Sequence, residues 1–123
     1  MDPEKIQAVL EDLLKFEDVY ACMVAKQGME GVVPDKSKFN PKVLGIIETL
    51  QTTIDNEFQI IKQYSDYGLG EMSFRLQDFE VRLYVLPGSE IALIAITPSQ
   101  ANRGLVEVTL ENARRKLIEI IKA

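Results

Sequence analysis

Apolar residues recur along this chain with two different periods. Three stretches place them three and four positions apart, which predicts amphipathic helices, and five stretches alternate or are continuously apolar, which predicts strands. The expected helices cover residues 3–14, 41–63 and 99–122. The expected strands cover residues 18–26, 32–33, 70–77, 79–85 and 91–96. The element order is therefore α-β-β-α-β-β-β-α.

The character of each strand predicts its place in a sheet. Residues 18–26 and 91–96 are apolar almost throughout, so both faces must be covered and both strands are central. Residues 32–33 are short and end at Pro34, and residues 70–77 alternate, so these two strands suit the edges. We expect one domain over residues 1–123. Its fold is an α+β sandwich with a five-stranded antiparallel sheet of order 2-1-5-4-3 and helices on both faces.

Composition argues against several binding classes. The net charge is −5, with Lys and Arg scattered among the acids, so no concentrated basic face for nucleic acid or an anionic membrane is expected. No apolar run approaches the about 20 residues of a membrane span, which argues against membrane insertion. The single cysteine and the lack of a secretory signal predict a cytoplasmic protein.

The chemistry of catalysis is poorly represented. There is no histidine, so neither a Ser-His or Cys-His nucleophile nor a His-containing zinc site can form. Cys22 lies in an apolar run and is expected to be a core thiol. The glycines of residues 28–31 and 68–70 lack the Lys-Ser/Thr of a phosphate-binding loop. We expect no enzyme activity, cofactor or metal site.

Self-association is the interaction that the pattern favours. Helix 41–63 is more apolar than one sheet face requires, and its neighbour, strand 70–77, is an alternating edge with weak protection against pairing. Both features predict a dimer about a two-fold axis; alternatively, the helix packs only on its own sheet and the edge is solvated. The expected dimer core consists of Ile47, Leu50, Ile54 and Phe58 from the helix and Met72, Phe74 and Leu76 from the strand.

Three segments resemble the Roadblock/dynein light chain family in order and spacing. Residues 19–28, Val-Tyr-Ala-Cys-Met-Val-Ala-Lys-Gln-Gly, are similar to its first strand and turn. Residues 91–97 and then 101–106, Ala-Asn-Arg-Gly-Leu-Val, are similar to its last strand and the opening of its last helix. The resemblance implies a profilin-like sandwich that homodimerises. It also implies a non-enzymatic scaffold or regulator of a Ras-like small GTPase, of the stand-alone prokaryotic type.

The opening of the last helix carries local expectations. Ser99 is expected to cap it. Gly104 lies in its first turns, where a missing side chain would let the helix approach the sheet closely. Arg103 departs from the apolar residue that is usual in the family.

The partner and the mode of action stay open at this stage. Two modes of action are open, stimulation of GTP hydrolysis by the partner or tethering of it, and so are two dimers, one with a second copy and one with a paralogue. Rival functions are a small-ligand sensor of the same fold and a structural subunit of a larger complex. The expected partner-binding residues are exposed positions of helix 41–63: Glu48, Gln51, Asp55 and Gln59.

Overall fold

Helices and strands follow one another in the order that the sequence predicts. The computed structural model describes residues 2–123, apart from the side chain of Met29. The α-helices and strands are α1 (Pro3–Leu13), β1 (Ala21–Lys26), β2 (Met29–Val32), α2 (Leu44–Gln63), β3 (Glu71–Arg75), β4 (Phe79–Val85), β5 (Ile91–Pro98) and α3 (Arg103–Lys122). Three short 3-10 helices lie between them: η1 (Lys36–Lys38), η2 (Pro41–Val43) and η3 (Ser65–Tyr67).

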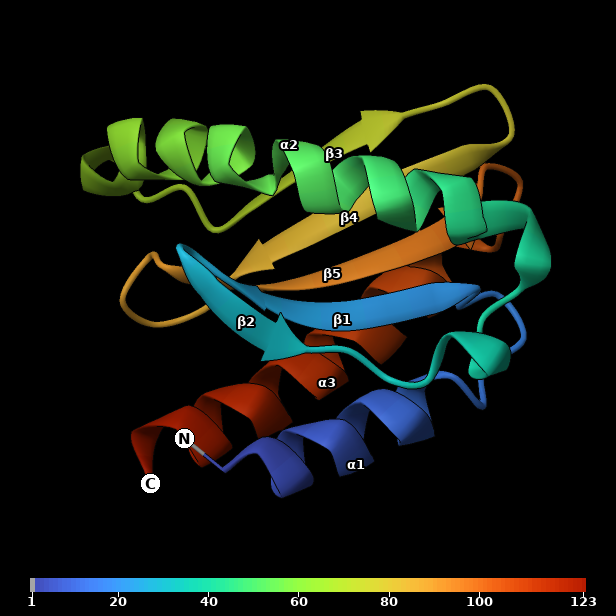
Figure 1. Cartoon of the computed structure of the whole chain (residues 1–123), viewed down its shortest axis with the longest axis horizontal. Helices are drawn as coiled ribbons and strands as arrows, with labels where there is room; N and C mark the ends of the chain where they lie inside the picture. The colour runs from blue at the N-terminus through green and yellow to red at the C-terminus, as the bar shows by residue number, and fades with distance from the viewer. Residues whose placement is uncertain (1) are drawn as a thin grey trace.

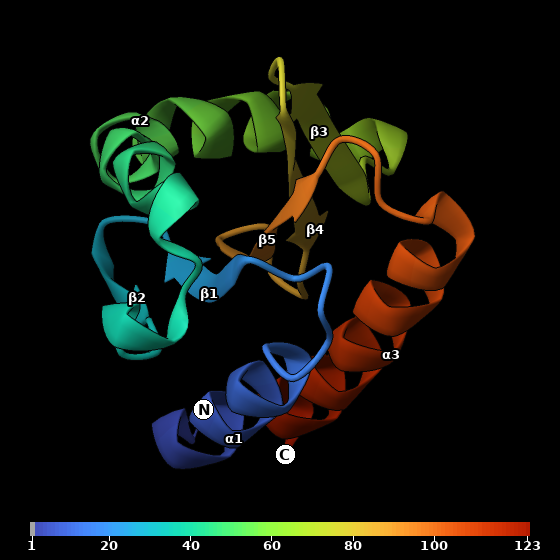
Figure 2. The same ribbon diagram turned by 90° about the vertical axis from the view of Figure 1, so that its right-hand side faces the viewer.

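One five-stranded sheet forms the middle layer. Its order is β2-β1-β5-β4-β3 and every neighbouring pair is antiparallel, which confirms the predicted topology. Helix α2 covers one face, and α1 and α3 lie side by side on the other (Figure 1). The view along the layers shows the sheet between them (Figure 2). The two edge strands are therefore β2 and β3, as expected.

The central strands supply both cores, because successive side chains of a strand point to opposite faces. On β1, Cys22 and Val24 belong to the core under α1 and α3, whereas Ala21 and Met23 belong to the core under α2. The α1/α3 core takes its helix residues from the predicted apolar stripes: Ile6, Leu10, Leu13, Val106, Leu110, Ala113 and Leu117. The α2 core takes Val43, Ile47, Leu50, Phe58 and Ile61.

Strand β4 corrects one expectation. Its alternating sequence predicts a single buried face, yet every residue from Glu80 to Val85 is buried. The reason is α3, which covers the face that carries the polar residues: Glu80 and Arg82 retain 5% and 9% of their exposure. An alternating pattern thus predicts that one face is polar but not that it is exposed. Here the polar face is buried, and its charged residues form ion pairs.

Two helix starts differ from the expectation. Asn40 caps a 3-10 turn, because its side chain accepts from the Lys42 N–H (3.0 Å), and α2 proper begins only at Leu44. Helix α3 begins at Arg103 and its cap is Asn102, whose Oδ1 accepts from the Leu105 N–H (3.0 Å). Ser99 instead lies in the preceding turn, so the predicted Ser99 cap is wrong.

The glycine that permits a close approach is Gly31 and not Gly104. A Cβ at Gly31 would lie 2.1 Å from the Val24 carbonyl oxygen, whereas a Cβ at Gly104 would meet only the Asn102 side chain, at 3.7 Å. Strand β2 begins at Met29, earlier than the predicted residues 32–33, and the turn before it is short because Gly28 adopts a φ of +67°. Gly31 therefore lies inside a strand.

Candidate interaction surface

The outer edge of β3 offers unused backbone hydrogen-bonding groups. Within residues 2–123 no strand pairs with this edge. On the inner side, Gly70 accepts from the Val85 N–H (2.9 Å) and the Leu76 N–H donates to Phe79 (2.8 Å), so the even-numbered residues form the hydrogen-bonded pairs with β4. The N–H and C=O groups of Glu71, Ser73 and Arg75 consequently point outward, away from the sheet.

The side chains of β3 divide between the two faces. Met72 and Phe74 are half-buried and pack against the core under α2, while Glu71, Ser73 and Arg75 are exposed on the α3 side. Leu76 follows the strand with 39% of its surface exposed. The three β3-region residues predicted for a dimer core thus lie at an accessible edge, although the dimer itself stays a prediction.

Helix α2 requires a correction. Ile47, Leu50 and Phe58 are 1%, 3% and 0% exposed, because their side chains fill the core between α2 and the sheet. They have no surface left for a second chain and hold the helix in place instead. Ile54 is half-buried beside them. The apolar stripe that predicts a dimer core on α2 is therefore the stripe that packs inward against the sheet.

A different flank of α2 lies next to β3. Gln51 and Ile54 line a pocket with residues of β1 and β2, so that side of the helix faces the β2 edge. The opposite flank, at about 100° per residue, carries Ile46, Thr53, Glu57 and Ile60. We call these four residues the β3-side flank. Its signal in the sequence is the pair Ile46 and Ile60, which lie outside the inward stripe; Ile60 is 42% exposed.

The β3-side flank continues into an aromatic end. Tyr64 and Tyr67 follow α2 with 54% and 85% of their surface exposed, and their rings lie 6.4 Å apart. Glu57 is half-buried and accepts from the Thr53 hydroxyl (3.3 Å). Exposed tyrosines are enriched in protein–protein interfaces, so Tyr64 and Tyr67 favour this end of α2 as a contact surface.

The predicted partner-binding residues Glu48, Gln51, Asp55 and Gln59 are all exposed on α2. The helix brings them together on its outer side and on the side toward β2, away from the β3-side flank. Two surfaces therefore run along one helix, and occupation of the β3-side flank leaves the other accessible.

An ion network that the sequence reading missed lies behind β3. The Glu80 carboxylate is paired with Arg75, Arg82 and Arg103, each at 3.3 Å. Arg82 also lies 3.9 Å from Glu107 on α3. Burial raises the pKa of the adjoining Tyr84 hydroxyl, and a hydrogen bond with Arg82 opposes that rise. Arg103, the departure from the family pattern, thus ties the start of α3 to β4.

The network borders a polar pocket of about 220 Å³ at the β3 edge. Glu71 and Ser73 of β3 form one wall, and Arg82, Arg103 and Glu107 form another. Because carboxylates and guanidinium groups are both present, this pocket is charged without being dominated by either sign. Charged residues of the edge strand and of α3 therefore line the same pocket.

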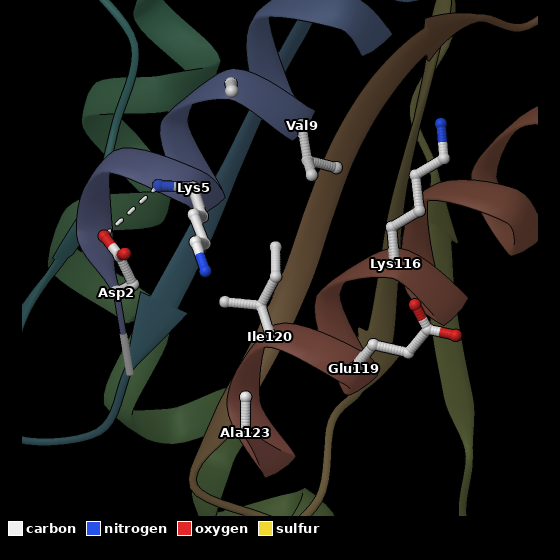
Figure 3. Close-up of a pocket in the computed structure, with 8 residues that line it drawn as sticks. Asp2, Lys5, Val9, Lys116, Glu119, Ile120 and Ala123 are labelled. Atoms are coloured by element: carbon white, nitrogen blue, oxygen red, sulfur yellow. Dashed lines mark hydrogen bonds between the residues drawn. The ribbon is translucent and has the colours of Figure 1, made fainter.

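A larger groove of about 600 Å³ lies between the ends of α1 and α3 (Figure 3). Its floor is apolar, with Val9 and Ile120, and its rim carries Lys5 and Lys116 together with Asp2 and Glu119. The rim charges balance, and Asp2 is occupied in capping α1 through the Glu4 N–H (3.0 Å). Nothing in this groove resembles a catalytic arrangement.

Metal and membrane chemistry are likewise not apparent in the described part of the chain. Among residues 2–123, no group of three or more Cys, Asp or Glu residues is placed to hold a metal ion. None of the described helices combines the length and apolarity that a bilayer span requires.

Comparison with known proteins identifies the fold. No protein-family sequence model and no curated protein sequence matches the chain. Solved structures do. The MglB of Myxococcus xanthus superposes with a TM-score of 0.76 at 14% identity, over 98% of this chain and 90% of that one.

Two further structures agree. An MglB with a tetrameric arrangement gives a TM-score of 0.67 at 16% identity, over 98% of this chain and 90% of its own. A Roadblock/LC7 domain from Streptomyces avermitilis gives 0.64 at 10% identity, over 95% and 98%. The chain therefore has the Roadblock/LC7 fold, which confirms the fold that the sequence resemblance implies.

Proposed function

We propose that this chain is a non-enzymatic homodimeric scaffold that binds a Ras-like small GTPase and regulates it. The observation that carries the proposal is the unpaired edge of β3 beside the apolar β3-side flank of α2, on a chain with the Roadblock/LC7 fold. A second copy related by a two-fold axis would supply β3 with hydrogen-bond partners and cover Ile46 and Ile60 at the same time. One similar structure is an MglB in a tetrameric arrangement, which supports self-association for this fold.

The proposed role assigns GTP hydrolysis to the partner. Gly28 lies in a tight turn and Gly68 ends a 3-10 helix in a left-handed conformation, and neither is followed by Lys-Ser/Thr or opens an α-helix. A phosphate-binding loop needs that context. The chain would act by holding the partner or by positioning the partner's own catalytic groups.

The outer side of α2 is the proposed GTPase-binding surface. It remains accessible when the β3-side flank is covered, and it carries Glu48, Gln51, Asp55 and Gln59. The two carboxylates would favour a basic patch on the partner, because complementary charge steers encounter and fixes orientation.

Light scattering tests the dimer. At micromolar concentration we expect twice the 13.9 kDa mass of one chain. Phe74→Asp should give a monomer, because two unpaired charges would be buried at the interface. The dimer dissociation constant should rise about a hundredfold or more. Phe16→Asp is the matched control, since Phe16 is an exposed phenylalanine outside α2 and β3. An unchanged mass for a folded Phe74→Asp protein would remove β3 from the interface.

A binding and turnover assay tests the partner. The protein is mixed in turn with each GTP-loaded Ras-like GTPase of its source organism, and binding and phosphate release are measured. Asp55→Arg should weaken binding, whereas Glu119→Arg on the exposed side of α3 should not. Faster phosphate release supports a regulator and binding without acceleration supports a tether. No binding by any Ras-like GTPase of the source organism contradicts the proposal.

One observation supports the rival small-ligand function. A pocket of about 330 Å³ lies between α2 and strands β1 and β2, with Met23, Leu50 and Ile94 among its apolar lining residues. Lys26, Glu30 and Gln51 supply its polar groups. An apolar metabolite that raises the melting temperature markedly, and an effect lost in Leu50→Trp, would favour the ligand sensor.

A further inference from the structure

The sequence of β3 is self-complementary in charge, size and hydrogen-bonding direction. Glu71 begins the strand, Arg75 ends it and Ser73 lies midway. These three residues share the α3-side face and also direct their backbone groups outward. An acid and a base placed symmetrically about a small residue are what an antiparallel strand needs to pair with itself.

We propose that β3 pairs with β3 of a second copy of this chain in one antiparallel register, centred on Ser73 and fixed by ion pairs between Glu71 and Arg75 of opposite copies. The inference rests on the dimer proposed above and specifies it. Ser73 lies opposite Ser73 of the second copy at the two-fold axis. Met72 then faces Phe74 of the second copy on the α2 side, beside the two β3-side flanks.

Hydrogen-bond direction restricts the register. Only residues with outward backbone groups can exchange hydrogen bonds across the edge, so Glu71, Ser73 and Arg75 must pair with one another. In the Ser73-centred register each of the three finds a partner within this set. A register centred on Met72 leaves Arg75 opposite Leu69, and one centred on Phe74 leaves Glu71 opposite Gln77. Both alternatives lose paired groups.

Charge selects the same register. Directly opposite residues of antiparallel strands have side chains in contact, so opposite charges favour pairing and like charges oppose it. The Ser73-centred register makes the Glu71–Arg75 pair twice. Registers centred on Glu71 or Arg75 place two like charges face to face. Those centred on Met72 or Phe74 place Ser73 opposite one of the charged residues and form no ion pair.

The ion pairs within one chain leave these two groups available. No Lys or Arg of residues 2–123 lies within ion-pair distance of Glu71. The Arg75 side chain bonds Glu80 through Nη2 (3.3 Å) and keeps 59% of its surface exposed. A guanidinium has five N–H donors, so Arg75 can bind Glu80 and a second carboxylate together. The pairing would extend the Glu80 network across the axis.

This arrangement recognises a particular partner. A paralogue whose edge strand lacks the acid or the base would leave Glu71 or Arg75 of this chain opposite a residue that cannot pair with it. The structure therefore favours a second copy of the same chain over a paralogue, which is the choice that the sequence leaves open. Specificity would come from the α3-side face, and most apolar contact from the α2-side face.

Single cysteines report the register directly. In the proposed register Ser73→Cys lies about 5.5 Å, Cα to Cα, from its counterpart, within disulfide range, so it should cross-link to a covalent dimer under mild oxidation. Met72→Cys and Phe74→Cys are separated from their own counterparts by about 8 Å and should stay unlinked alone. They should cross-link with each other when mixed. Cys22 does not interfere, because burial raises the pKa of its thiol to about 12.

Charge exchange tests the ion pairs. Glu71→Lys and Arg75→Glu should each weaken the homodimer about tenfold or more, since attraction becomes repulsion at two places. An equimolar mixture of the two variants should form a heterodimer of parental affinity, because Lys then faces Glu and Arg faces Glu. The double variant E71K/R75E should homodimerise. Damage within each subunit cannot produce this rescue, since both subunits keep their own substitution.

The outcomes separate this inference from the dimer on which it rests. A monomeric parent protein removes both. A dimeric parent in which Met72→Cys or Phe74→Cys links to itself, or in which mixing the charge variants restores nothing, removes the register and its ion pairs and leaves the dimer standing.

Discussion

Gly31 shows how one absent side chain can determine where a strand lies. Its Cα faces the Val24 carbonyl so closely that a Cβ would stand 2.1 Å from the oxygen. This backbone contact cannot relax as a flexible side chain would. The sequence predicts only a turn around Gly31. Nothing local distinguishes a glycine that is needed for a positive φ from one that is needed because a neighbouring backbone lies too close for a Cβ.

Gly31→Ala should destabilise the fold by about 1–3 kcal/mol, since β2 must shift away from β1. Gly45→Ala is the matched control: its Cβ would meet nothing within 4 Å and it lies on an exposed helix turn. That control should stabilise by about 0.5–1 kcal/mol. Urea unfolding monitored by circular dichroism measures both. Equal effects of the two substitutions would contradict the close approach.

Each element was predictable to the extent that its burial follows its own pattern. The stripes of α1 and α3 and the continuous strands β1 and β5 pack as their sequences indicate. Helix α2 was placed correctly, but its inward stripe was assigned to an interface. The spacing of apolar residues says which side of a helix is buried and cannot say by what. The polar face of β4 was missed for the same reason, because α3 covers it.

The start of α3 offers a test at this scale. Asn102→Ala should cost about 1 kcal/mol, because the Leu105 N–H loses its acceptor at the first turn. Ser99→Ala should be nearly neutral, since Ser99 precedes the cap and the helix N-terminus is capped by Asn102 instead. Thermal unfolding of the two variants discriminates between the caps. A larger loss for Ser99→Ala would restore the sequence-based assignment.

The whole molecule is stabilised by two cores that share the same central strands. Cys22 lies in one of them, where its thiol donates to the Leu10 carbonyl (3.4 Å) and joins β1 to α1. The layered fold and strand order followed from the sequence, because continuous strands demand cover on both faces. The edge position of β3 also followed from the sequence, but the helix flank beside it did not, because that flank is known only once the inward side of α2 is known.

Stability should fall at alkaline pH through Cys22. Burial raises its pKa from 9.0 to about 12, so above pH 9.0 the unfolded chain loses a proton that the folded chain keeps. The stability that the buried neutral thiol of Cys22 contributes is fully present below pH 9.0 and is lost as the pH rises toward 12. At pH 10 we expect a loss of about 1 kcal/mol that Cys22→Ala does not show. Urea unfolding of both proteins at pH 8 and pH 10 measures it, and an equal loss in the Cys22→Ala protein would contradict this prediction.

Strand β2 explains why association through β3 would stop at two chains. A sheet with two usable edges could add copies without limit and grow into a fibre. The second edge here is four residues long, and its register with β1 slips between Val24 and Lys26. An irregular and short edge is a poor template for further strands. The close approach at Gly31 keeps that edge drawn against β1, so one end of the sheet is built to join and the other to terminate.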